Sequence, residues 1–455
     1  MKNLNKILYT FSFVFLVFLS SCGTEDLDPT LAQDKDLTGN INTVNDLQGI
    51  MFGAYDQMTQ SNYYGRDFII NNEVRTDNTF ANGNSGRFLT QGAFGYLPST
   101  SDGVWTPAYA VIASANIVIG TDITSLSGDK DFAKHLQGEA YAIRALAHFD
   151  LLRNYGQQHT GGTLGVPYIK EFSSEATSPS RNTIEEVKSF IIEDLQTAFN
   201  MMQNNYFDSS KQTVSKFTAK ALESKVAIYF GMWEEAKAAA KAVIDSGVYS
   251  IIPASNYVAS FASDGSQNSI FELAFSNVDN LAGNSLGFMY KGDTYGDIQV
   301  LPEVENIYTA GDVRADILGY EGSKLRNLGK YPELNGYDNV AIIRFEEVIL
   351  NYAEALFETG GDALTELNKI TSNRNADPYT TVTKEDILNE RRKELIFEGF
   401  RYDDLLRTGK GIEKISILQN IEATIPYGDH KLAMPIPIDE MDANSNMVQN
   451  TGYNQ

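Results

Sequence analysis

Apolar residues recur with a helical period in several segments of this chain. Residues 184–199 carry one apolar stripe that runs through Val187 and Ile191, which is the pattern of an amphipathic helix. Thr183 and Glu186 stand at the spacing of a capping box, in which each side chain satisfies a free amide of the first turn. We therefore expect a helix that begins directly after Thr183.

The same period predicts six further helices. They span residues 136–154, 216–230, 233–245, 342–357, 362–372 and 385–399. The first of these is apolar on nearly all sides, which is typical of a buried helix. The last opens with Thr383 and Asp386 at capping-box spacing. Helix is therefore the expected dominant secondary structure.

These helices are expected to pack as hairpins, because each apolar stripe needs a neighbour to bury it. The predicted pairs are 184–199 with 216–230, 233–245 with 342–357, and 362–372 with 385–399. The alanine-rich residues 233–245 resemble the first helix of a tetratricopeptide unit, in which small side chains let the partner helix approach closely. The expected fold class is mostly α, built from tetratricopeptide-like helical pairs.

Two long irregular regions, residues 60–102 and 246–339, interrupt this helical pattern. Both are rich in Gly, Asn and Asp and contain many Tyr and Phe residues. Long irregular segments are usually disordered or functional, and the aromatic content argues against disorder. Because loops on a rigid scaffold commonly carry binding residues, we expect the two regions to form a ligand face.

The N-terminus has the order of a secretory signal peptide. Lys2 and Lys6 precede an apolar run over residues 7–19, which is too short to span a bilayer comfortably. The sequence Leu-Ser-Ser-Cys at residues 19–22 resembles a bacterial lipobox, and Cys22 is the only cysteine of the chain. These features predict export followed by lipidation.

We predict a signal peptide over residues 1–21, a lipid anchor on Cys22 and a polar tether over residues 22–35. The acidic pair in this tether resembles the export signal of lipoproteins that face outside, so we expect a lipid-anchored protein on the outer face of the outer membrane. With no second thiol, no internal disulfide can form. An ordinary secretory signal with a chance cysteine is the alternative.

The charge of the chain excludes some partners. It has 36 Lys and Arg against 59 Asp and Glu, a formal net charge of -23, and loss of Lys2 and Lys6 with the signal peptide makes it more acidic. Such a balance opposes binding to nucleic acid and to anionic headgroups. Attachment to a membrane must therefore come from the lipid alone.

The C-terminal part carries a long motif. Residues 390–407 read ERRKELIFEGFRYDDLLR, which resembles the E-R-R-x-E-L-x-x-E-G-x-R-x-x-D-L-x-R segment of the SusD/RagB proteins. Shorter segments that resemble the same family, in the same order, lie at residues 65–68, 73–78, 105–116, 139–145, 165–168 and 435–446. The chain departs from the family at Thr408-Gly409, where Trp-Gly is common. We expect this difference to alter local packing and not the fold.

The resemblance implies a SusD-like α-α superhelix of four tetratricopeptide-like pairs over residues 36–455, divided into parts 36–232 and 233–455. It also implies capture of an extracellular nutrient for a TonB-dependent outer-membrane barrel. The charges of the long motif are expected to form structural ion pairs one helical turn apart, Glu390 with Lys393 and Glu398 with Arg401.

For ligand binding we expect aromatic rings that stack on the apolar face of a sugar, with polar side chains that bind its hydroxyls. The candidate platforms are Tyr63, Tyr64, Trp105, Tyr290 and Tyr295, and the candidate polar partners are Arg66, Asp67 and Asn78. The alternative for each ring is that it anchors a loop to the scaffold. An oligosaccharide is the favoured ligand, and an oligopeptide is the alternative in the same architecture.

Catalysis is not expected. Residues 283–287 match the G-x-S-x-G pattern around Ser285, but no apolar strand precedes them and only His430 follows. The four histidines show no metal-ligand spacing, so no metal site is predicted, although the acidic loops could hold calcium. A surface hydrolase and a purely structural adaptor remain the alternatives from other classes.

Overall fold

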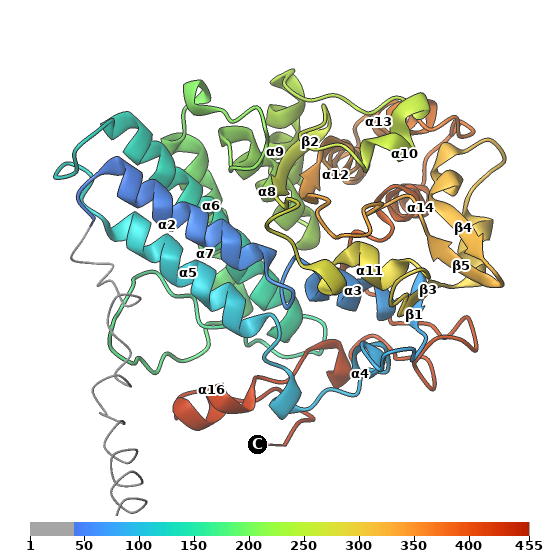
Figure 1. Ribbon diagram of the computed structural model, residues 1–455, viewed down its shortest axis with the longest axis horizontal. Helices are drawn as coiled ribbons and strands as arrows, with labels where there is room; N and C mark the ends of the chain where they lie inside the picture. The colour runs from blue at the N-terminus through green and yellow to red at the C-terminus, as the bar shows by residue number, and fades with distance from the viewer. Residues whose placement is uncertain (1–40, 455) are drawn as a thin grey trace, which may run out of the picture.

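The computed structural model describes residues 41–454, and its helices stack side by side across the molecule (Figure 1). The main helices are α2 (Val44–Thr59), α5 (Trp105–Gly120), α6 (Lys130–Tyr155), α7 (Ile184–Met201), α8 (Lys216–Tyr229), α9 (Trp233–Asp245), α12 (Phe345–Glu358), α13 (Ala363–Ser372) and α14 (Lys384–Leu395). The mostly α fold is therefore confirmed. The predicted signal peptide, the lipidation site Cys22 and the tether 22–35 lie outside the described residues.

The helices pack mainly on their neighbours in the chain. Helix α6 packs against α5 and α7, α8 packs against α7 and α9, and α9 packs against α12. Both predicted capping boxes are present, at Thr183 with Glu186 and at Thr383 with Asp386. The predicted pairs α7 with α8 and α9 with α12 are therefore confirmed.

Helix α6 is buried on nearly all sides, as its sequence predicts. Ala140, Ile143 and Ala147 are fully buried, and the Arg144 guanidinium donates to both carboxylate oxygens of Asp194 on α7 at 2.7 Å. A bidentate pair of this kind fixes orientation as well as distance. It sets how α7 lies on α6.

Two helix boundaries and one pairing differ from the prediction. Helix α12 begins at Phe345, because Val340–Arg344 forms strand β6. Helix α14 ends at Leu395, because Phe397 and Gly399 adopt positive φ angles of 69° and 81° and turn the chain into α15 (Arg401–Arg407). The third predicted pair is wrong in its main contact, since α13 packs on α12 and not chiefly on α14.

The irregular regions contain short elements. The helices among them are α3 (Asp67–Val74), α4 (Leu89–Gly92), α10 (Tyr257–Ser260) and α11 (Leu286–Tyr290), and α16 (Ile438–Ala443) follows near the C-terminus. The strands are β1 (Thr79–Ala81), β2 (Ser269–Leu273), β3 (Ile298–Val300), β4 (Leu318–Glu321), β5 (Lys324–Asn327) and β6. They form three antiparallel pairs, β1 with β3, β2 with β6 and β4 with β5.

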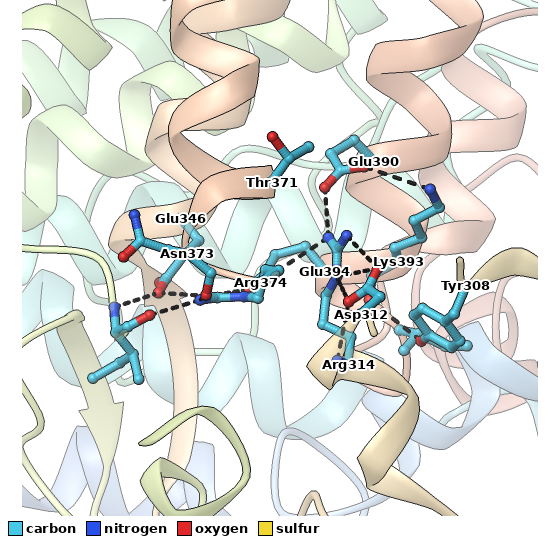
Figure 2. A network of polar contacts seen from close by, with 12 residues as sticks. Tyr308, Asp312, Arg314, Glu346, Thr371, Asn373, Arg374, Glu390, Lys393 and Glu394 are labelled. Atoms are coloured by element: carbon cyan, nitrogen blue, oxygen red, sulfur yellow. Dashed lines mark hydrogen bonds and ion pairs between the residues drawn. The ribbon is translucent and has the colours of Figure 1, made fainter. Parts of the chain in front are cut away.

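The charges of the long C-terminal motif form a buried ion network (Figure 2). The Arg374 guanidinium lies between Glu346 at 3.0 Å and Glu394 at 2.8 Å, and Arg314 lies 2.7 Å from Glu390. Burial alone would raise the pKa of Glu394, but the surrounding guanidinium groups hold it well below its usual range. The network joins the end of α13 to α12 and α14.

The two predicted ion pairs of the motif have different outcomes. Lys393 lies 3.7 Å from Glu390, as predicted. Glu398 instead pairs with Lys330 and Arg344. That prediction is wrong because α14 ends before Glu398, so residues 398 and 401 are not one turn apart on a helix.

None of the helices between residues 41 and 454 combines the length and the apolar content that a membrane span requires.

Candidate functional site

The two irregular regions meet at the strand pair β1 and β3, which lie beside each other in Figure 1. Phe80 stands opposite Gln299 in this pair. Beyond the strands, the Asn82 side chain donates to the Gly296 carbonyl at 2.7 Å, and the Ser85 amide donates to Asp297 at 2.9 Å. Loops far apart in sequence are thereby held in one surface.

Tyr295 presents a ring at this junction. It is 42% exposed, and the Arg87 guanidinium lies 4.6 Å from its ring centroid. Phe288 packs against it at 5.4 Å, and the Asn84 side chain donates to the Tyr295 carbonyl at 2.6 Å. A ring held on several sides keeps one orientation, so a ligand that stacks on it loses little to ordering the side chain.

A polar cluster lies in the same loops. The Arg66 guanidinium donates to Asp67 at 2.6 Å and to the Asn284 side chain at 2.7 Å, and it lies over the Phe88 ring at 5.7 Å. The side chains of Arg66 and Asp67 are 13% and 23% exposed. We call the surface formed by Arg66, Asp67, Arg87, Asn284 and Tyr295 the loop face.

The backbone beside the loop face is strained. Phe88 has φ 63° and Ala282 has φ 45°, both in the left-handed region that residues with a Cβ rarely adopt. Each such residue costs about 1 to 2 kcal/mol, which the surrounding contacts must offset. Strain of this kind gathers at binding and active sites, and here it lies on both sides of the Arg66 cluster.

Five of the eight predicted ligand residues are buried and are not part of the loop face. They are Tyr63, Tyr64, Asn78, Trp105 and Tyr290. Each is at most 6% exposed, so none can offer a face or a free amide to a ligand in this arrangement. The structure corrects the prediction for these five, and the alternative that they anchor loops describes their contacts.

The contacts of the buried rings explain this placement. The Tyr63 hydroxyl donates to Asp150 of α6 at 2.5 Å. Trp105 packs edge-on against Tyr155 at 5.0 Å, and Tyr290 stacks on Tyr331 at 6.2 Å. Tyr63 thus ties the first irregular region to α6, Trp105 holds α5 against α6, and Tyr290 packs within the second irregular region.

Asn78 and its neighbour Asp77 tie the first irregular region to the long motif. Asn78 donates to Glu73 at 3.0 Å and accepts from Arg392 at 2.9 Å. Asp77 accepts from Arg401 at 2.8 Å and lies 3.0 Å from Arg392. We call Asp77, Arg392 and Arg401 the Asp77 clamp.

The pKa of the Asp77 carboxylate in the clamp is strongly lowered. Burial would raise the pKa of Asp77, but the hydrogen bond from Arg401 and the charges of Arg401 and Arg392 lower it to about 2. Glu73, which lacks such a partner, has its pKa raised to about 7 by burial. Asp77 is therefore ionised wherever the protein is folded near neutral pH.

Arg66, Asp67 and Tyr295 remain as predicted candidates, and the structure adds two residues that sequence reasoning missed. Arg87 is the only basic residue between Arg75 and Lys130, a signal that could have drawn attention to it. In the sequence, Asn284 stands out only as part of the G-x-S-x-G pattern. Its position beside Arg66 follows from contacts between residues 218 apart in the chain.

The arrangement around Ser285 is not that of a nucleophile. A short 3-10 turn, Ala282–Asn284, precedes it instead of a strand, and its hydroxyl caps α11 by accepting from the Phe288 amide at 3.3 Å. Among residues 41–454 no group of three His, Cys, Asp or Glu side chains is placed to hold a metal ion. The loop face itself offers the exposed Tyr295 ring and the polar side chains of Arg66, Asp67 and Asn284.

Known proteins share both the sequence pattern and the fold of this chain. Residues 27–228 match a family model described as starch-binding and associating with the outer membrane, and residues 246–453 match the model of the SusD family. A SusD superfamily protein of Bacteroides vulgatus has the same fold, with a TM-score of 0.84 and 29% identity over 91% of this chain and all of its own chain.

Two curated proteins are also similar. SusD-like protein P38 of Formosa agariphila is 25% identical over 420 residues, which covers 77% of this chain and 79% of its own length. The starch-binding protein SusD of Bacteroides thetaiotaomicron is 26% identical over 181 residues, which covers 38% of this chain and 31% of its own length. The two family matches cover both halves of the chain and the fold agrees along nearly all of it, so this chain belongs to the SusD/RagB family.

Proposed function

We propose that this protein binds an extracellular oligosaccharide at the loop face and delivers it to a TonB-dependent outer-membrane transporter. The observation that carries the proposal is the exposed Tyr295 ring, fixed by Arg87 and placed in the same loops as donors and acceptors on Arg66, Asp67 and Asn284. A sugar presents an apolar face for such a ring and hydroxyls for such polar groups.

The relatives support this ligand class. The curated SusD relative is named as starch-binding, and one matching family model is described as starch-binding and associating with the outer membrane. The proposed location is the outer face of that membrane, with Cys22 lipidated as its anchor. A protein attached in this way can capture a ligand but needs a partner to move it inward, which is why we propose a barrel transporter.

Binding by Tyr295 can be tested with purified protein on an array of neutral glycans and oligopeptides, followed by calorimetry with the strongest binder. Tyr295→Ala should weaken binding by at least about tenfold, equal to about 1.4 kcal/mol, which is the scale for losing an aromatic anchor. Arg87→Ala should weaken binding less, because it removes the contact that orients the Tyr295 ring but leaves the ring itself in place.

Tyr320→Ala is the matched control, since Tyr320 is also an exposed tyrosine, at 57%, on strand β4. It should leave the affinity unchanged. Equal affinity of wild-type protein and Tyr295→Ala for every glycan would refute the site. Binding to peptides alone would replace the oligosaccharide with the alternative ligand class.

The transporter partner is tested separately. A tagged protein isolated from native outer membranes should bring with it a large β-barrel protein. Recovery of the tagged protein alone, from membranes in which it is lipidated, would refute delivery while leaving ligand capture intact.

A further inference from the structure

A cleft lies between α2 and the first turns of α6. Its volume is about 580 Å³, within the range of small-ligand sites. Residues that line it include Phe52, Tyr55, Asp56, Glu139, Tyr206 and Asp208. None of the loop-face residues lines this α2–α6 cleft.

Aromatic rings form part of its wall. Phe52 is 52% exposed on α2, whose other large apolar side chains pack into the core. Phe132 and Tyr206 pack against each other at 5.1 Å, and the Tyr206 hydroxyl donates to Asp129 at 2.7 Å. The Tyr206 ring is therefore held in place, and the Phe52 ring remains open to a ligand.

Asp208 adds a fixed negative charge to the lining. It accepts from the amides of Ser210 at 2.8 Å and Gln212 at 3.0 Å and from the Ser210 hydroxyl at 2.5 Å. Burial would raise the pKa of Asp208, but these hydrogen bonds lower it below its usual value. Its carboxylate is thus charged and fixed while it faces the cleft.

At the buried end of the cleft lies Glu139. Its carboxyl accepts from the Tyr55 hydroxyl at 2.5 Å and lies 3.5 Å from His135. Burial raises the pKa of Glu139 to about 8 and lowers that of His135 to about 4. At neutral pH both side chains are therefore uncharged.

The charge of the lining selects among ligands. Among the described residues that line the cleft, four are acidic, namely Asp56, Glu139, Asp208 and Asp279, and none is Lys or Arg. An anionic ligand would meet the carboxylates of Asp56, Asp208 and Asp279 with no Lys or Arg beside them in the lining, which raises the cost of its burial. A neutral polyol would find acceptors and aromatic rings.

We propose that the α2–α6 cleft is a second binding site, which takes a neutral sugar unit. Phe52 supplies the ring on which the sugar stacks, and Asp56 accepts from its hydroxyls. The site is separate from the loop face and shares with the proposed function only the glycan class of its ligand.

The test uses the detergent-solubilised full chain on an array of neutral, amino, uronic and sulfated glycans. At least one neutral glycan should lose about tenfold or more of its binding in Phe52→Ala and keep it in Tyr295→Ala. Asp56→Lys should weaken binding of the same glycan, because it removes an acceptor and adds a cation. Unchanged thermal midpoints should accompany both variants, since both side chains are exposed.

Phe172→Ala is the matched control, because Phe172 is a phenylalanine with 37% exposure outside this cleft. It should leave every signal within about twofold of wild type. The proposal is overturned if no glycan depends on Phe52, or if the dependent glycans are uronic or sulfated. Dependence on Tyr295 without dependence on Phe52 would overturn the second site and leave the proposed function standing.

Discussion

Replacing Asp77 by asparagine removes the negative charge that Arg392 and Arg401 share. The Asp77 side chain is only 16% exposed, so water can replace little of the lost interaction. A fall of its pKa from 3.8 to about 2 corresponds to about 2 kcal/mol of folding free energy at neutral pH, at about 1.4 kcal/mol per pKa unit. Asp77→Asn should lose about that amount.

The assay is urea denaturation at pH 7, followed by tryptophan fluorescence and circular dichroism. Asp245→Asn is the control, because Asp245 is also an ion-paired aspartate, with Lys241, but its side chain is 58% exposed. The control should remain close to wild type, since exposed ion pairs contribute little. The slope of free energy against urea should be the same for all three proteins.

The sign of the pH dependence follows from the lowered pKa. The stabilisation from Asp77 is present above the unfolded pKa near 3.8 and is lost as the pH falls through the folded pKa near 2. At pH 3 the difference between wild type and Asp77→Asn should have shrunk to about half of its value at pH 7. A difference below about 0.5 kcal/mol at pH 7, or one that does not shrink toward pH 3, would refute the reasoning.

Three further outcomes are expected. Burial raises the pKa of Glu139 from 4.5 to about 8, so between these values the folded state holds a proton that the unfolded state has lost. The free energy of unfolding of the wild type in urea should therefore decrease as the pH rises from 5 to 8. Glu139→Gln has no such proton to lose and should show a smaller decrease. Ser285→Ala should lower stability by about 1 kcal/mol, through loss of the helix cap, and leave ligand affinity intact in calorimetry. Cys22→Ser should appear in the soluble fraction, and mass spectrometry of the wild-type N-terminus should show a diacylglycerol-modified cysteine.

The helical scaffold was predictable because its signals are local. Capping boxes and a 3.6-residue period lie within one segment, and they placed α7 and α9 within two residues of their observed ends. Strand β6 was missed because Val340–Arg344 is apolar without a clear period and continues directly into α12. Its partner, Ser269–Leu273, lies far away in sequence.

The candidate site was predictable only in outline. Sequence could indicate that two aromatic loop regions form a face, but not which rings point outward. A tyrosine has an apolar ring and a polar hydroxyl, so it suits both the core and the surface. Tyr63 can be buried because its hydroxyl finds an acceptor, Asp150, which lies 87 residues away in the sequence. Tyr295 differs from it in having no such partner in the described chain and in resting on Arg87 at the surface.

The pairing of β1 with β3 has a consequence for how the protein is made. The loop face needs contacts such as that between Arg66 and Asn284, which are 218 residues apart, and contacts so distant in sequence form late because a long loop must close first. A nascent or truncated chain that stops before Tyr295 lacks both this ring and strand β3, so it cannot form the loop face. It also lacks Asp403, which pairs with the buried Arg153 of α6, so the scaffold and the loop face both wait for the C-terminal part of the chain.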